Sequence, residues 1–135
     1  MKANIERTDK KRIVIVGGGL GGLELAFKLV DDDYQVVLID KNNYHQFPPL
    51  IYQVASGGLE PSSISFPFRR LFQGKKDFFF RMAKVESVNT DKKIINTTVG
   101  EIDYDYLVMA FGAKTNFFGN KDIEATTLPM KSVSE

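Results

Sequence analysis

The sequence has 135 residues, 43% of them hydrophobic and 26% charged, which is ordinary for one globular domain with its own core. Its 18 lysines and arginines nearly balance 17 aspartates and glutamates, so the charge gives no sign of a nucleic-acid partner. There are no cysteines, which excludes disulfides, thiolate metal sites and redox dithiols within these residues.

A strand, a helix and a second strand are predicted near the N-terminus, after a flexible polar lead over residues 1–10. Residues 11–16 end in a β-branched apolar run that is typical of a buried parallel strand. Residues 23–30 carry apolar side chains at helical spacing. Residues 34–40 form a second apolar run that ends on an acid, Asp40. The three segments fit one right-handed βαβ unit.

The segment that follows is predicted to be mostly irregular. Residues 41–61 are rich in Asn, Pro, Gly and aromatic residues, and leave room only for a short helix at about 50–55. After it, Ser62 or Ser63 is a candidate cap for a segment that runs toward Leu71.

The second half is predicted to add β structure to the fold. Residues 77–99 contain alternating runs and a tight turn, which predict a small antiparallel β-meander, and residues 104–110 read as another buried strand. The predicted fold class is α/β, a Rossmann-like parallel sheet with the meander inserted, in one domain over residues 11–135. Residues 128–135 look like the start of a further element, so we expect this domain to be incomplete at its C-terminus.

A glycine-rich motif stands between the first strand and the first helix. Gly17, Gly19 and Gly22 satisfy G-x-G-x-x-G, the pattern of dinucleotide-binding turns. Gly17 permits the sharp turn, Gly19 allows backbone to approach a pyrophosphate, and Gly22 allows close packing of helix on sheet. The N–H groups and dipole of the helix N-terminus then face the phosphates.

Asp40 strengthens this interpretation because it ends the second strand, 23 residues after Gly17. A carboxylate there can accept hydrogen bonds from both ribose hydroxyls and would repel a 2′-phosphate. The pattern therefore favours a dinucleotide with a free ribose diol. No G-x-x-x-x-G-K-[ST] motif occurs, so a P-loop nucleotide triphosphatase has no support. The motif alone does not distinguish FAD from NAD.

Further residues resemble a known family. Residues 14–24 resemble the opening of the FAD domain in the pyridine-nucleotide flavoprotein superfamily. Residues 40–47 and 49–55 are similar to type II NADH:quinone oxidoreductases. Residues 107–113 resemble the second family signature, a strand that runs into Ala-Thr-Gly-Ala, except that Phe111 replaces the threonine.

The resemblance implies FAD as the cofactor and assigns residues to it. Residues 17–21 would surround the pyrophosphate, Asp40 and Lys41 would lie at the adenosine ribose, and the backbone of Val85 would contact the adenine. Ala110 and Gly112 would lie beside the pyrophosphate and ribityl chain, and residues 49–55 would run near the flavin. The predicted cofactor-binding residues are Gly17, Gly18, Gly19, Leu20, Gly21, Gly22, Asp40, Lys41, Val85, Ala110 and Gly112.

No catalytic or metal-binding residue is predicted. His45 is the only histidine, and a local packing or hydrogen-bonding role is favoured over a proton donor near flavin or quinone. Gln53 could face the flavin or belong to a polar loop, and both roles stay open. No cluster of His, Asp and Glu has metal-ligand spacing.

By resemblance, the whole protein would take electrons from NADH through FAD to a quinone, as a cytoplasmic enzyme peripheral to the inner face of the cell membrane. Contact with the membrane would use a C-terminal region, and this sequence alone is expected to lack turnover. A homodimer is one option for an oligomeric state that stays open. Two alternatives remain: another reductase of the superfamily, such as a ferredoxin-type reductase, or a non-catalytic nucleotide-binding module that prefers NAD.

Overall fold

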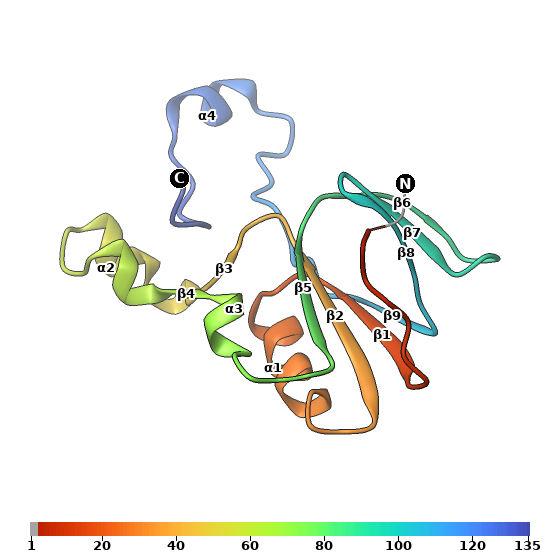
Figure 1. Ribbon diagram of the computed structural model, residues 1–135. Helices are drawn as coiled ribbons and strands as arrows, with labels where there is room; N and C mark the ends of the chain where they lie inside the picture. Colours follow the sequence, from red (N-terminus) through yellow and green to blue (C-terminus); the bar gives the residue numbers. More distant parts are fainter. Residues whose placement is uncertain (1–2) are drawn as a thin grey trace.

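The computed structural model describes residues 3–135, and its centre is a four-stranded parallel sheet (Figure 1). The strand order is β5-β2-β1-β9, which is the α/β arrangement predicted from the sequence. The strands are β1 (Lys11–Val16), β2 (Tyr34–Asp40), β5 (Phe78–Met82) and β9 (Tyr106–Met109). The first two strands have the predicted bounds, and the helix between them, α1 (Leu20–Leu29), begins three residues earlier than expected, directly after the glycines.

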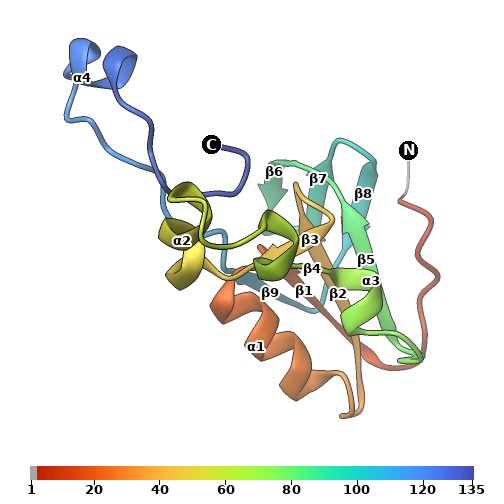
Figure 2. The same cartoon turned by 90° about the vertical axis from the view of Figure 1, so that its left-hand side faces the viewer.

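The sheet is covered on both faces, which explains its nearly continuous apolar strands. Ile13 and Ile15 face α1 and the short helix α3 (Phe68–Leu71), whereas Val14 and Val16 face a layer of antiparallel strands. Figures 1 and 2 show α1 and this antiparallel layer on opposite sides of the sheet. Parallel strands buried on both faces lose the polar alternation of a solvated sheet.

The antiparallel layer is a three-stranded meander, but its position differs from the prediction of residues 77–99. It consists of β6 (Val85–Asn89), β7 (Ile94–Thr97) and β8 (Gly100–Asp103). The aromatic run expected to open the meander forms β5 instead, and pairs in parallel with β2. Its apolar side chains on both faces suit a strand covered from two sides, and the meander therefore starts later and ends at residue 103.

The connection between β2 and β5 forms an arm beside the sheet. Its short elements are β3 (Tyr44–Gln46), η1 (Pro48–Leu50), α2 (Ile51–Ala55), η2 (Pro61–Ile64) and β4 (Ser65–Pro67). Strands β3 and β4 pair antiparallel and bring the chain back to α3. The short helix was expected, but neither serine caps a segment toward Leu71: both lie inside η2, and Pro67 is the N-cap of α3.

Residues 3–10, expected to be a flexible lead, make contacts that the sequence analysis did not predict. Ala3 is buried and its N–H donates to the Glu101 carbonyl at 3.0 Å. The buried Arg12 donates to the carbonyls of Ile5 and Glu6 and to the Asp103 carboxylate. The start of the chain is thereby joined to β1 and to the meander.

Residues 110–135 leave the sheet as a long loop with one short helix, α4 (Lys121–Thr126), which was not predicted (Figure 2). The Asn120 side chain caps it by accepting from the N–H groups of Asp122 and Ile123. Gln46 in the arm accepts from the Val133 N–H at 3.0 Å. Within residues 3–135, no helix combines the length and apolar character needed to cross a membrane.

Candidate dinucleotide-binding site

Residues 17–22, here called the glycine loop, pass from β1 into α1 through very close packing. Gly17 has φ of +104°, a conformation that favours glycine, and its N–H donates to the Ile39 carbonyl at 2.8 Å. A Cβ on Gly17 would lie 2.4 Å from the Ala110 carbonyl oxygen, and one on Gly22 only 1.8 Å from the Gly17 oxygen. The roles predicted for these two glycines, turning and close packing, agree with this geometry.

Gly18 is enclosed on every side, which the sequence analysis did not foresee. Its N–H donates to the Asp40 carboxylate at 2.7 Å, and its carbonyl lies 2.9 Å from the His45 Nδ1. A Cβ at this position would lie 2.1 Å from the Phe68 ring. The motif does not require glycine at its second position, so the need for it here comes from tertiary packing against α3.

The other side of the glycine loop is open. In the described part of the chain, a Cβ on Gly19 or Gly21 meets no atom within 4 Å beyond its own neighbours. Gly19 is the N-cap of α1, and no side chain among residues 3–135 caps this helix end. The first N–H groups of an uncapped helix, with its dipole, attract an anionic group. An open backbone beside an uncapped helix start fits the pyrophosphate of a dinucleotide.

Asp40 reaches this loop from the end of β2. One carboxylate oxygen accepts from the Gly18 N–H, and the other accepts from the Asn42 N–H at 2.8 Å. Each oxygen keeps lone-pair capacity for a further donor, and the residue is half-buried. Asp40 therefore shapes the loop while remaining able to accept from a ribose. Lys41, next to it, is exposed.

The remaining predicted residues lie on elements that also meet this end of the sheet. The Ala110 N–H donates to the Val16 carbonyl at 2.7 Å, which sets Ala110 directly beside the glycine loop. Gly112 has φ of +70°, so the chain turns away from β9 in a conformation that suits glycine. The Ala83 N–H donates to the backbone carbonyl of Asp40 at 2.9 Å, so Val85 lies two residues beyond a direct contact with β2.

Two polar residues of the arm have hydrogen-bond partners within the protein. His45 is 5% exposed and hydrogen-bonds the Gly18 carbonyl, so it has a packing and hydrogen-bonding role as predicted, but its partner is 27 positions earlier in the chain and not local. The Gln53 side chain donates to the Tyr52 hydroxyl at 2.9 Å on an exposed part of α2, so a contact with flavin stays a prediction. Among the described residues, no group of three or more His, Cys, Asp or Glu is arranged to hold a metal ion.

Comparison with known proteins gives the family. The family model described as pyridine nucleotide-disulphide oxidoreductase matches residues 11–133, nearly the whole chain. The chain belongs to this family. The match spans both the glycine loop and Ala110, which directly follows β9, so the two segments that meet in the site belong to one family domain.

Within this family, the chain is similar to type II NADH:quinone oxidoreductases. The type II NADH:quinone oxidoreductase NdhA of Mycobacterium tuberculosis is 33% identical over 132 residues, which cover 93% of this chain and 28% of the relative. The corresponding Haemophilus influenzae enzyme is 33% identical, covering 84% of this chain and 29% of the relative. The resemblance to type II enzymes stated from the sequence is thereby confirmed, and the chain spans less than a third of these relatives' length.

Solved structures agree on the fold of this family member. NDH2 from Plasmodium falciparum in complex with NADH superposes with a TM-score of 0.75 at 31% identity, covering 85% of this chain and 25% of that one. The sulfide:quinone oxidoreductase of Aquifex aeolicus gives 0.73 at 34% identity, covering 79% and 25%. Both superpositions support the α/β fold described above.

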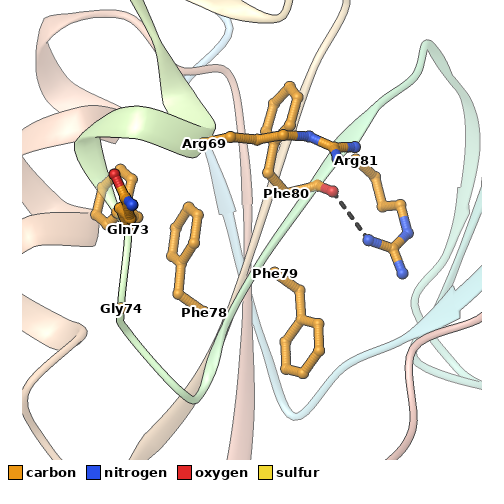
Figure 3. A pocket seen from close by; sticks show the side chains of 8 residues that line it. Arg69, Gln73, Gly74, Phe78, Phe79, Phe80 and Arg81 are labelled. Atoms are coloured by element: carbon orange, nitrogen blue, oxygen red, sulfur yellow. Dashed lines mark hydrogen bonds between the residues drawn. The ribbon is translucent and has the colours of Figure 1, made fainter.

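A hollow lies at the outer edge of the sheet, apart from the glycine loop (Figure 3). It measures about 320 Å³ and is lined by residues of α3 and β5 and the turn between them. The Arg69 side chain extends toward Arg81 here, and the Arg81 guanidinium, which points away from Arg69, donates to the Phe80 carbonyl at 2.9 Å. Burial and the charge of Arg69 lower the pKa of Arg81. Phe78 stacks on Phe72 with ring centroids 3.8 Å apart, so these aromatic side chains belong to the core.

Proposed function

We propose that this chain is the FAD-binding part of a type II NADH:quinone oxidoreductase. The observation that carries the proposal is the open face of Gly19 at the uncapped start of α1, with Asp40 beside it. The similarity to type II enzymes over 93% of the chain supports this choice of family member. These 135 residues hold no cysteine, so no redox dithiol lies in this part of the protein, which agrees with a flavin that passes electrons without one here.

The residues that would hold FAD are the eleven predicted from the sequence. The N–H groups at Gly19, Leu20 and Gly21 would donate to the pyrophosphate, where the backbone is exposed. Asp40 would accept from the ribose hydroxyls with the lone pairs that its two backbone contacts leave free. Gly17, Gly18 and Gly22 contribute by packing, because each lies too close to its neighbours to carry a side chain. Lys41, Val85, Ala110 and Gly112 complete the proposed set.

When bound, FAD supplies the redox chemistry that connects NADH to a quinone. The chain's own contribution is to bind and orient: the glycine loop fixes the phosphates, and Asp40 selects a ribose without a 2′-phosphate. In this proposal NADH, quinone and the inner face of the cell membrane are partners of the whole protein, and this chain alone has no NADH:quinone turnover.

The test is a titration of the purified chain with FAD and, separately, with NAD. Flavin fluorescence reports binding of FAD, and the melting temperature reports either ligand, since a ligand that binds only the folded state stabilises it. We expect stabilisation by FAD alone, and its loss in Gly19→Val and Asp40→Ala. Stabilisation by NAD alone would replace the proposal with a nicotinamide-binding module, and robust quinone reduction by the chain would contradict its expected inactivity.

A further inference from the structure

The imidazole of His45 contacts the backbone of the glycine loop from the arm. Its Nδ1 lies 2.9 Å from the Gly18 carbonyl oxygen, and the residue is only 5% exposed. A carbonyl can only accept, so Nδ1 must carry the hydrogen of this bond. The neutral tautomer with hydrogen on Nδ1 and the protonated ring both satisfy this requirement. The contact joins β3 to residues that are 27 positions earlier in the chain.

The hydrogen bond from His45 to the Gly18 carbonyl also orients the N–H of Gly19. The Gly18 carbonyl and the Gly19 N–H belong to one planar trans peptide group, so they point in opposite directions. His45 holds the carbonyl toward the buried side. The Gly19 N–H therefore points away from His45. Gly19 itself is exposed, and a Cβ there would meet no described atom within 4 Å beyond its neighbours.

Other residues contact the N–H and the Cα of Gly18, whereas the peptide group between Gly18 and Gly19 is held by His45. Asp40 holds the Gly18 N–H, which belongs to the preceding peptide group, and the Phe68 ring packs against the Cα side. Glycine has wide conformational freedom, so the peptide between Gly18 and Gly19 would rotate readily without a partner for its carbonyl. His45 supplies that partner from outside the motif.

We propose that His45 is a positioning residue, which aims the Gly19 N–H at a phosphate of the bound dinucleotide. The proposal rests on the proposed function for the identity of the ligand, FAD. In this proposal His45 would touch neither the ribose nor the flavin. It acts through the peptide group, so its contribution is to affinity for a pyrophosphate and not to proton transfer.

Three substitutions separate a hydrogen-bonding role from simple packing. In His45→Asn, the side-chain amide nitrogen can occupy the place of Nδ1 and donate to the Gly18 carbonyl. In His45→Gln the amide lies one bond further from the backbone, near the place of Nε2, so it does not replace Nδ1. In His45→Phe a ring of similar shape remains, but the hydrogen-bond donor is lost. We expect the Kd for FAD to rise about tenfold in the Gln and Phe variants and to stay within about threefold in the Asn variant.

The same variants are measured without ligand by NMR relaxation of the Gly19 amide, whose N–H belongs to the peptide group that His45 holds. The order parameter of this N–H should be that of a rigid backbone in the unaltered chain and in His45→Asn, and should fall to flexible values in His45→Gln and His45→Phe, because the peptide group is released. If the unaltered chain binds no FAD, the proposed function fails, while the Gly19 order parameter still decides whether His45 holds the loop. Wild-type affinity in His45→Phe, or equal losses in the Asn and Gln variants, would overturn the positioning role.

Discussion

The Asp40 carboxylate accepts a hydrogen bond from the Gly18 N–H at 2.7 Å, which ties the end of β2 to the glycine loop. An acid at this place is expected from the dinucleotide-binding pattern as a ribose ligand. Here it has a second task within the protein itself. Because the same side chain also accepts from the Asn42 N–H, it organises the loop before any ligand binds.

Replacing Asp40 should therefore lower the stability of the ligand-free protein as well as its affinity for FAD. Asp40→Ala removes the acceptor for two backbone N–H groups, and we expect the free energy of unfolding to fall by about 1–2 kcal/mol. Urea denaturation without ligand measures this. Asp33→Ala is the matched control, since that side chain is 93% exposed and should change stability by less than about 0.5 kcal/mol. Equal stability of the two variants would show that Asp40 serves only the ligand.

The glycines of the loop should divide into two classes when substituted. Gly22→Ala would set a Cβ against the Gly17 oxygen, and we expect a loss of at least about 2 kcal/mol in unfolding free energy. In Gly19→Val the new side chain would point into open space at a φ of −70°, so the unfolding free energy of the ligand-free protein should change by about 1 kcal/mol at most. Its FAD affinity should nevertheless fall at least tenfold. Urea denaturation and flavin titration together test the division, which a large unfolding effect of Gly19→Val would contradict.

Substitution of Arg12 should cause one of the largest losses of stability outside the candidate site. Its guanidinium is buried, donates to the Gln35 side chain at 2.6 Å, and pairs with Asp103 at 2.7 Å. Burial lowers the pKa of Arg12, although the charge of Asp103 opposes this. Arg12→Met should lower the unfolding free energy by about 2 kcal/mol or more, since partners would lose their donors. Lys11→Met, whose side chain is 68% exposed, should be nearly neutral in the same urea experiment.

Stability should fall in acid because of two aspartates near Arg7. Hydrogen bonds from the Arg7 side chain and the Arg12 backbone lower the pKa of Asp105. Burial alone would raise the pKa of Asp103, but Arg7 and Arg12 hold it below its usual value. The unfolded chain therefore binds more protons just below the ordinary aspartate pKa of about 4, and stability is lost as pH falls through the folded-state values.

Melting temperatures measured from about pH 5 to about pH 3 test this expectation. The double variant Asp103→Asn, Asp105→Asn should be less stable at neutral pH and should show a shallower acid decline. The wild type and the variant would have parallel declines if other carboxylates were responsible.

The local pattern of apolar residues was sufficient to predict the βαβ unit, but it was insufficient to predict which strands pair. β1 and β2 were predicted with their observed bounds because a buried strand is marked by its own apolar run. The run Phe78–Phe80 has the same character, yet nothing within it indicates whether its partner is a meander strand or β2. That choice depends on pairing with residues about 40 positions earlier. For this reason the predicted meander began too early.

By itself the sequence determined the class of fold, the glycine motif and the acid that follows it, since each depends on residue type and short spacing. The tertiary structure alone decided what surrounds the motif. Phe68 reaches Gly18 from α3, and His45 reaches it from β3. Both contacts require the arm to fold back over the end of the sheet, and such long-range packing leaves no periodic mark in the chain. The open space beside Gly19 is likewise a result of tertiary structure, because no described element packs against it.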